Sequence, residues 1–207
     1  MDSESPYRIA AGALLVVLAA VGAIFRLRAA RSGEDLRPQR RQEGAPLLAL
    51  RAALGILFIG APLAYLADPP LLAWAAVPLP GWLRWSGAAV AAAGVPLLFW
   101  VLHTLGANLT DTVAIRRHHT LVTNGPYRWV RHPFYIAVTL EIAALGLLLA
   151  SWPAALGLAG FWVYLWRRTP LEEAKLTERF GDAYREYAAR TGRYFPRLQA
   201  RRLLGGK

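Results

Sequence analysis

The chain has 207 residues, of which 56% are hydrophobic, and it carries a formal net charge of +11 without a single cysteine. The missing cysteine excludes disulfides and thiolate chemistry, so any catalysis relies on other side chains or on a cofactor. Membrane orientation and attraction to anionic lipid account for the positive charge, and nucleic-acid binding is not expected.

Apolar residues gather in five blocks of about bilayer length, which predicts transmembrane helices because bare backbone cannot lie in hydrocarbon. The blocks are residues 9–25, 45–67, 82–102, 134–150 and 153–166. Arginines follow the first block and no small-residue cleavage site does, so we expect a retained helix rather than a removed signal peptide. The predicted fold is an all-α integral membrane protein with about five transmembrane helices and a C-terminal cytoplasmic amphipathic helix.

Basic residues sort between the connecting segments. Residues 26–51 hold seven arginines, residues 68–81 hold none, and four more arginines lie between the third and fourth blocks. The positive-inside rule then places the N-terminus outside and the C-terminus in the cytoplasm. The Ala-, Leu- and Arg-rich usage indicates a GC-rich bacterial genome, and hence the bacterial inner membrane.

The two halves of the chain differ in character. We expect residues 1–102 to form a three-helix transmembrane scaffold and residues 103–207 to form a functional half. The second half comprises a cytoplasmic loop, a helical hairpin over residues 133–167 and a C-terminal helix over residues 170–191. The short turn at residues 151–153 brings the cytoplasmic ends of the hairpin together, and with them His132 and Arg167.

The start of the C-terminal helix is predicted from a capping pattern. Thr169 takes the N-cap position, Pro170 the first turn, and Glu172 lies three residues after the cap. Gly181 and Asp182 mark a possible division of this helix.

All four histidines lie within thirty residues of one another, at positions 103, 118, 119 and 132. No carboxylate or cysteine stands beside them at ligand spacing, and adjacent histidines point in different directions on a regular element. We therefore expect no metal site.

The hairpin gathers polar and aromatic side chains at its mouth, with a turn-rich segment above. Arginine suits carboxylates, Glu suits a ribose hydroxyl or a cation, and aromatic faces attract a positive centre. Such a pocket suits a zwitterionic cofactor together with an anionic substrate. Its members are Gly125, Pro126, Tyr127, Arg131, His132, Tyr135, Arg167, Arg168, Glu172 and Glu173.

Each of these residues also has a purely structural interpretation. The arginines lie where the positive-inside rule places anchors, and the aromatic residues suit an interfacial belt. Glu172 serves the capping pattern, and His132 before Pro133 can cap the fourth block. Glu141 differs, because an ionisable group two turns inside an apolar block usually faces a bundle interior or cavity.

Taken in order, these motifs resemble a known family. The order is Gly-Pro-Tyr, Arg-His-Pro-x-Tyr, an apolar hairpin, Arg-Arg, Glu-Glu and Phe-Gly-x-x-Tyr-x-x-Tyr. It is similar to the isoprenylcysteine carboxyl methyltransferase family, with phospholipid N-methyltransferases as relatives, over residues 103–198. The resemblance implies a helical membrane enzyme that uses S-adenosylmethionine, enclosed by the last two spans, their connecting segments and the C-terminal helix.

Carried over by position, the resemblance assigns roles to individual residues. The Arg-Arg and Glu-Glu motifs fall on Arg167, Arg168, Glu172 and Glu173, which are catalytic candidates. The chemistry of methyl transfer then indicates that Arg168, and secondly Arg167, would orient an acceptor carboxylate, whereas an amine acceptor would need a base such as Glu141 or Glu173. Two positions depart from the family pattern: Ala137 replaces a glycine, and Ala107 replaces a basic or larger residue. The cofactor-binding positions are His119, Gly125, Pro126, Tyr127, Arg131, His132, Pro133, Tyr135 and Glu172.

The predicted function is S-adenosylmethionine-dependent methyl transfer to a lipidic or prenylated acceptor at the boundary between membrane and cytoplasm, most simply carboxyl O-methylation of an isoprenylcysteine-like substrate. Three alternatives stay open. The chain could methylate a lipid amine, act as an NADPH-dependent membrane reductase with its basic loop on the cofactor phosphates, or serve as a non-catalytic membrane module.

Overall fold

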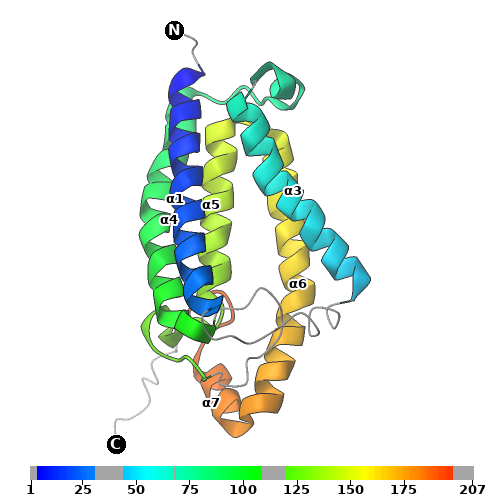
Figure 1. Ribbon diagram of the computed structural model, residues 1–207. Coiled ribbons are helices and arrows are strands. Elements are labelled where there is room, and N and C mark those ends of the chain that lie inside the picture. The colour runs from blue at the N-terminus through cyan, green and yellow to red at the C-terminus, as the bar shows by residue number, and fades with distance from the viewer. Residues whose placement is uncertain (1–3, 31–43, 68, 109–119, 198–207) are drawn as a thin grey trace, which may run out of the picture.

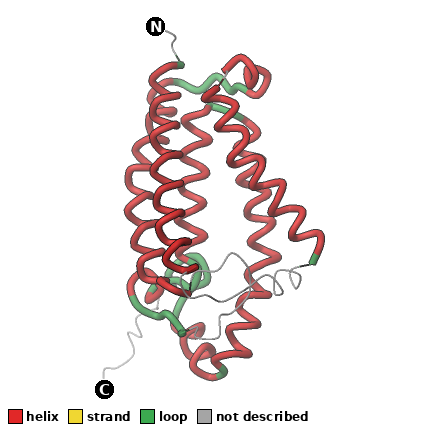
Figure 2. The backbone as a smooth tube through the Cα atoms, in the orientation of Figure 1, coloured by secondary structure: helices red, strands yellow, loops and turns green. Residues whose placement is uncertain are grey.

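The computed structural model describes residues 4–30, 44–67, 69–108 and 120–197, and the described chain is almost entirely helical (Figures 1 and 2). Three short 3-10 helices accompany the long ones: η2 (Pro69–Ala75), η3 (Gly106–Asn108) and η4 (Gly125–Arg128). The α-helices are α1 (Ser5–Ala30), α3 (Ala45–Ala67), α4 (Gly81–Leu105), α5 (Pro133–Leu149), α6 (Trp152–Phe180) and α7 (Asp182–Arg190).

The arrangement is that of a membrane protein. Helices α1, α3 and α4 are each long and apolar enough to cross a bilayer, and α5 is a shorter apolar helix of 17 residues. In Figure 1, α1, α4 and α5 run side by side, and α7 lies at the end opposite the N-terminus. Helices α3 and α6 pack against each other, and α6 also contacts α5. The chain is therefore an all-helical integral membrane protein.

Helix α6 differs from the prediction at Thr169. The predicted helix start there is wrong, because α6 runs without a break from Trp152 through Pro170 to Phe180. Thr169 is fully buried, and its hydroxyl lies 2.7 Å from the hydroxyl of Tyr194, so it contacts the C-terminal segment instead of capping a helix. Tertiary packing has overridden the local signal.

The predicted C-terminal helix over residues 170–191 is consequently the end of α6 followed by α7. The division at Gly181 is confirmed: this residue has a φ of +56°, ends α6 and directly precedes α7. A positive φ suits glycine, which has no side chain to clash.

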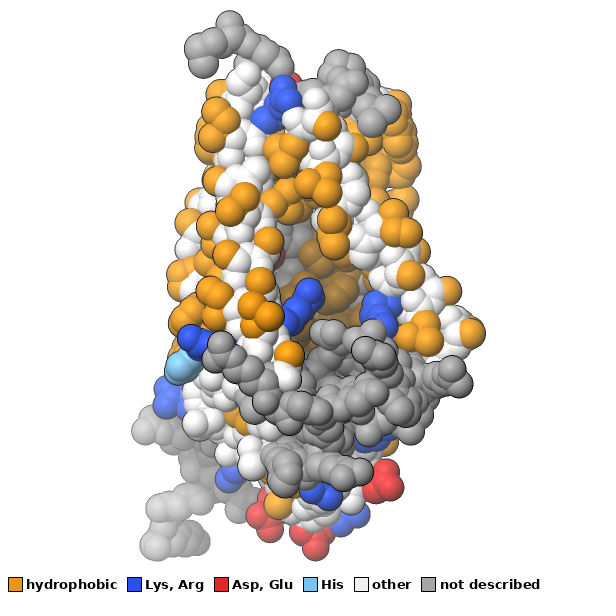
Figure 3. Space-filling view, viewed as in Figure 1, with side chains coloured by type: hydrophobic (Ala, Val, Ile, Leu, Met, Phe, Trp, Pro, Cys, Tyr) orange, Lys and Arg blue, Asp and Glu red, His pale blue; other side chains and the backbone are white. Residues whose placement is uncertain are grey.

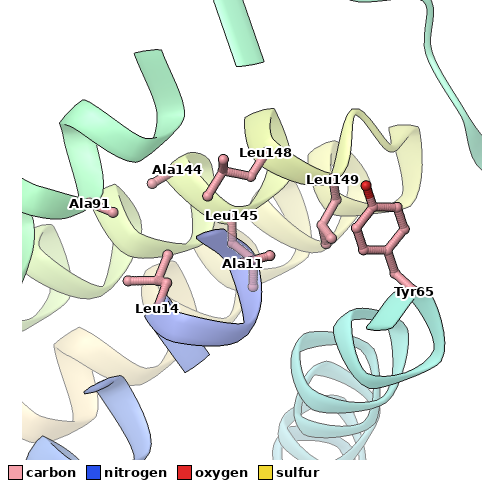
Figure 4. Packing of buried hydrophobic residues seen from close by; sticks show 8 residues of the cluster. All are labelled: Ala11, Leu14, Tyr65, Ala91, Ala144, Leu145, Leu148 and Leu149. Atoms are coloured by element: carbon pink, nitrogen blue, oxygen red, sulfur yellow. The ribbon is translucent and has the colours of Figure 1, made fainter. Parts of the chain in front are cut away.

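The tightest helix pair is formed by α4 and α5. Gly87 of α4 faces the backbone of α5, where a Cβ atom would lie 2.6 Å from the carbonyl oxygen of Ala144. Small residues allow such close approach between helices in a membrane, where packing rather than water drives association. The neighbouring core draws on α1, α3, α4 and α5 (Figure 4): Ala11, Leu14, Tyr65, Ala91, Ala144, Leu145, Leu148 and Leu149.

A buried arginine ties the same four helices together near the start of α1. The guanidinium of Arg84 donates to both carboxylate oxygens of Glu4, at 2.7 and 2.8 Å, and to the Tyr65 hydroxyl at 3.0 Å. It also donates twice to the carbonyl of Leu148, at 2.8 and 3.1 Å. A buried charge such as that of Arg84 is stabilising only when all of its hydrogen-bond partners are present, because removing one partner leaves a buried charge uncompensated.

We predict that Gly87→Ala destabilises the protein although alanine is the better helix former. The added methyl group would collide with the α5 backbone, at about 1–3 kcal/mol for an overpacked site. The matched control is Gly55→Ala in α3, where a Cβ atom meets nothing within 4 Å. In detergent, the melting temperature should fall for Gly87→Ala and stay level or rise for Gly55→Ala. Equal shifts would contradict the close α4–α5 contact.

Candidate active site

The carboxylate of Glu173 contacts three basic side chains beside the start of α5. Glu173 of α6 accepts hydrogen bonds from Arg131 at 2.9 Å and from Arg193 at 2.5 Å, and its Oε1 lies 3.1 Å from Nε2 of His132. The Glu173 side chain is only 13% exposed. We call Arg131, His132, Glu173 and Arg193 the polar cluster.

Backbone pairing fixes the polar cluster in place. The amides of Arg131 and His132 donate to the carbonyls of Gly192 and Arg193, and the amide of Gly192 donates back to Trp129. Gly192 is required here, because a Cβ atom would collide with the carbonyl of Phe195. The segment after α7 is thereby docked on the segment before α5, so residues about sixty positions apart meet at one point.

The guanidinium of Arg131 strengthens this docking. Its Nη1 donates to the carbonyls of Ala188 at 3.0 Å and Thr191 at 2.6 Å, which close the end of α7. Arg131 thus joins α6, through Glu173, to α7 and the start of α5.

Beside the polar cluster lies a second network, formed by Tyr135, Arg168 and Glu172, which we call the wall network. The Tyr135 hydroxyl donates to Glu172 at 2.5 Å and accepts from Nε of Arg168 at 2.8 Å. Arg168 also donates to the hydroxyl of Tyr164 at 2.8 Å. The rings of His132 and Tyr135 stack at a centroid distance of 5.2 Å, so the two networks touch.

The electrostatics of Glu173 follow from these contacts. Burial by itself would raise the pKa of Glu173, but the hydrogen bonds from His132, Arg193 and Arg131 outweigh it and hold the pKa well below the ordinary value of 4.5. Glu173 is therefore a firmly ionised carboxylate and a weak base. This geometry suits an anchoring role better than the base role considered for an amine acceptor.

A cavity of about 660 Å³ opens between α1, α3, α5 and α6, and its lining is mainly apolar. Figure 3 shows this hollow on one face, with apolar side chains around it and basic side chains beside its lower end. Helices α1 and α3, which belong to the first half of the chain, contribute to this lining. Its ionisable and tyrosine lining consists of Arg26, Arg51, Tyr135, Glu141, Tyr164 and Arg168.

The wall network separates the two environments. Tyr135 and Arg168 line the apolar cavity, and both reach Glu172, which leads on to the polar cluster through the neighbouring Glu173. An amphiphile in the cavity and a polar ligand beside Glu172 would thus both lie next to Tyr135 and Arg168.

Most of the predicted site residues come together in this structure. Arg131, His132, Tyr135, Arg168, Glu172 and Glu173 belong to the two networks, and Pro133 begins α5 beside them. Arg167 does not join, because its exposed side chain lies over the ring of Trp166, 5.1 Å from the centroid. The predicted meeting of His132 with Arg167 is therefore corrected: His132 meets Glu173, and Arg168 turns inward.

The predicted turn at residues 125–127 forms η4. Gly125, with a φ of +53°, lies against Thr104 at the end of α4, and the carbonyl of Tyr127 accepts from the hydroxyl of Tyr187 at 2.8 Å. The turn thus bridges α4 and α7 next to the networks. His119 lies outside the described residues.

The two departures from the family pattern have different outcomes. The methyl group of Ala137 is fully buried in the core with Val21 and Phe25 of α1, so it fills a helix contact. The side chain of Ala107 lies outside the described part of the chain.

Three residues of the site escaped the sequence analysis. Arg193 reaches the polar cluster because the backbone folds back at Gly192. No local sequence pattern predicts that turn. Tyr164 lies one helical turn before Arg168, a spacing that could have suggested contact. Tyr184 stands in the Phe-Gly-x-x-Tyr-x-x-Tyr motif without a predicted role in the site, and its hydroxyl is buried without a hydrogen-bond partner among the described residues.

Comparison with known proteins finds a family that is similar to the part of the chain that holds most of this site. Residues 87–178 match the model of the isoprenylcysteine carboxyl methyltransferase (ICMT) family, in agreement with the resemblance seen in the sequence. The structure of a eukaryotic intramembrane Ras methyltransferase ICMT superposes with a TM-score of 0.58 at 22% identity, covering 92% of this chain and 67% of that one. At this identity the likeness shows a shared fold.

Individual relatives have different names. The chain is 32% identical over 126 residues to the cobalt-zinc-cadmium resistance protein CzcN of Cupriavidus metallidurans, covering 57% of this chain and 56% of that protein. It is 34% identical over 115 residues to protein-S-isoprenylcysteine O-methyltransferase B of Arabidopsis thaliana, covering 53% and 57%. The human protein-S-isoprenylcysteine O-methyltransferase is 31% identical over 112 residues, covering 53% and 39%. The chain thus spans about half the length of these relatives.

We predict an acid-dependent loss of stability that Glu173→Gln removes. Because the folded-state pKa of Glu173 lies below 4.5, its charge stabilises the fold above pH 4.5, and this contribution is lost progressively as the pH falls below that value. Melting temperatures in detergent should therefore drop more steeply below pH 4.5 for the wild type than for Glu173→Gln, which starts lower at pH 7. The pKa of Glu4 is lowered too, but Glu4 is present in both proteins. Its contribution to the pH dependence therefore cancels when the two curves are subtracted. Parallel curves would contradict the assignment.

Proposed function

We propose that the chain is an S-adenosylmethionine-dependent membrane methyltransferase of the isoprenylcysteine carboxyl methyltransferase family, whose model matches residues 87–178, and that it esterifies a carboxylate on a lipidic or prenylated acceptor. One observation supports this proposal above all others. Tyr135 and Arg168 line an apolar cavity and also bond into a polar site, so that a lipid-borne acceptor and a polar cofactor can meet there.

The residues present fit the cofactor. The side chain of Glu172 keeps 29% exposure and offers acceptor oxygens for ribose hydroxyls. The Tyr184 hydroxyl, buried without a partner in the described part of the chain, is a group that a bound ligand can satisfy. The stacked rings of His132 and Tyr135 provide aromatic faces near the positive centre of the cofactor. We assign Arg131, Pro133, His119 and the turn at residues 125–127 to the same site.

Bound S-adenosylmethionine supplies a methyl group that is already activated by a positively charged sulfur. An acceptor carboxylate is ionised at neutral pH and needs no base. The task of the chain is therefore to position the acceptor and to exclude water. Arg168 does the first through a charge-assisted hydrogen bond to the carboxylate, and the apolar lining of the cavity does the second.

A lipid amine is the second candidate acceptor, but it would have to be neutral before it could accept a methyl group. Glu173 is a weak base in its cluster of three basic side chains. Glu141 lies six residues after Tyr135 on α5, roughly 9 Å along the helix axis. A carboxylate acceptor needs no base and therefore fits the observed geometry better than an amine acceptor does.

The remaining alternatives fit the site less well. An NADPH-dependent reductase needs cations for the cofactor phosphates, whereas Arg131 and Arg193 both engage Glu173. A non-catalytic membrane module would have no use for a connected network at the wall of a cavity.

We infer a topology with five spans, in which α5 and the first part of α6 complete the three longer apolar helices. The N-terminus lies outside and the C-terminus in the cytoplasm, most simply at the bacterial inner membrane. Both networks then lie at the cytoplasmic boundary of the bilayer, where a soluble cofactor arrives from water and an acceptor from lipid. The amphipathic end of α6 and α7 lie on that cytoplasmic face.

We predict that S-adenosylhomocysteine binds the detergent-purified protein, that NADPH does not, and that His132→Ala weakens nucleoside binding at least about tenfold. The loss of a stacked ring and of a charged hydrogen bond corresponds to about 1.5–3 kcal/mol. The matched control is His103→Ala, an exposed histidine stacked on Phe99. Titration calorimetry measures all three proteins.

NADPH binding alone would move the protein to the reductases. If folded protein binds neither S-adenosylhomocysteine nor NADPH, the non-catalytic membrane module is favoured.

We predict that Arg168→Gln lowers kcat/KM for a carboxylate acceptor about 100-fold, within the range for loss of one pre-positioned donor. Binding of S-adenosylhomocysteine should change by only a few fold, because the cofactor rests mainly on other residues. Arg167→Gln is the control, since its side chain is exposed, and should stay within about threefold of the wild type. Equal losses of kcat/KM in both variants would contradict a role of Arg168 in orienting the acceptor.

A further inference from the structure

Glu141 is a buried ionisable residue that the proposed methyl transfer to a carboxylate does not use. It lies on α5, is 4% exposed and lines the same apolar cavity as Tyr135 and Arg168. Neither of its carboxyl oxygens has a hydrogen-bond partner among the residues that the structure describes. In this respect it differs from Arg84, Arg168 and Glu173, which all have several partners.

The surroundings of Glu141 are shaped to hold a carboxyl group. Gly94 of α4 faces it, and a Cβ atom at Gly94 would collide with Oε1 of Glu141. The glycine thus leaves the room that the carboxyl group occupies. Around it the cavity lining is apolar, with Leu98 and Val138 among its members.

An unpaired carboxyl group in such a place is unfavourable. A buried polar group without a hydrogen bond costs roughly 1–3 kcal/mol by protein mutational data, and an isolated charge costs more. Ionisable residues inside transmembrane bundles mark substrate or ion pathways for this reason. Glu141 lines a space large enough for an amphiphile, so a rotation of its carboxyl group away from Gly94 would let a ligand in that space provide the missing partner.

We propose that Glu141 recognises a hydrogen-bond-donating group, such as a hydroxyl, amide or amine, on the apolar part of the acceptor. The inference rests on the proposed function and narrows its substrate class. Tyr135 and Glu141 are six residues apart on one helix, which places the donor group roughly 9 Å from the carboxylate that Arg168 orients. The preferred acceptor is then an amphiphile with two polar points, one at its end and one within its chain.

This site would act as a selectivity filter. An acceptor with a plain hydrocarbon tail would leave Glu141 unpaired, and sites built to pair a polar group discriminate strongly against analogues that lack it. A purely apolar residue at position 141 would remove the discrimination without touching the wall network.

The test compares two fatty acids of equal length, stearate and 10-hydroxystearate, whose hydroxyl lies near the middle of the chain. Both are titrated calorimetrically into the full chain in nanodiscs, without cofactor, for the wild type, Glu141→Gln and Glu141→Leu. The measured quantity is the ratio of the two apparent Kd values. Comparing this ratio between proteins cancels the unequal partition of the two acids into lipid.

We expect the wild type to favour the hydroxylated acid at least about tenfold more than Glu141→Leu does. Glu141→Gln should keep most of the preference because its amide still accepts a hydrogen bond. Gly94→Ala should reduce it, because the added methyl group displaces the carboxyl group. If Glu141→Leu does not fold, Glu141→Met provides the apolar comparison. The same ratio in the wild type and in a folded apolar variant would overturn the inference.

The outcome is separate from that of the proposed function. Discrimination by Glu141 is measured without S-adenosylmethionine, whereas the methyltransferase assignment stands or falls with nucleoside binding and ester formation. A protein that binds the nucleoside but shows no discrimination keeps its proposed function and loses only the role of Glu141.

Discussion

The cost of an unpaired charge inside a hydrocarbon-facing bundle determines where the ionisable side chains of this chain lie. At one end, Arg84 is surrounded by Glu4, Tyr65 and the carbonyl of Leu148. At the other end, Glu173 is surrounded by three basic side chains. These two sets join helices that are far apart in the sequence. Among the described residues, the carboxyl group of Glu141, between the ends, has no such partner, and groups of this kind are where ligands are to be sought.

The same constraint explains why the candidate site lies at a boundary. Its polar cluster is assembled outside the apolar bundle by backbone pairing between the segments before α5 and after α7. Its apolar cavity is built inside the bundle by α1, α3, α5 and α6. The wall network of Tyr135, Arg168 and Glu172 links the two sides through hydrogen bonds. Chemistry between a polar reactant and a lipidic one has its natural place there.

Sequence reasoning succeeded where a signal is local and failed where a contact is made by folding. Apolar length predicted α1, α3 and α4, the three helices that are long and apolar enough to cross a bilayer. The order of short motifs predicted the family match over residues 87–178 and most members of the two networks. The cap at Thr169 was wrong, because packing against Tyr194 continues α6 through Pro170. Of the two neighbouring arginines, Arg168 turns inward and Arg167 outward, because one helical position separates opposite environments. Arg193 could not be predicted, since only the docking of a distant segment brings it to Glu173.

The most direct test of the central claim is the chemical nature of the product. The full chain in nanodiscs is given S-adenosylmethionine labelled in its methyl group and a prenylated cysteine acceptor, and the labelled lipid is then treated with base. A carboxyl methyl ester releases its label as volatile methanol, whereas a methylated amine keeps it. We predict base-labile label in the wild type and at most about one hundredth of it in Arg168→Gln. Base-stable label, or none in folded protein that binds S-adenosylhomocysteine, would contradict a carboxylate acceptor at the wall network.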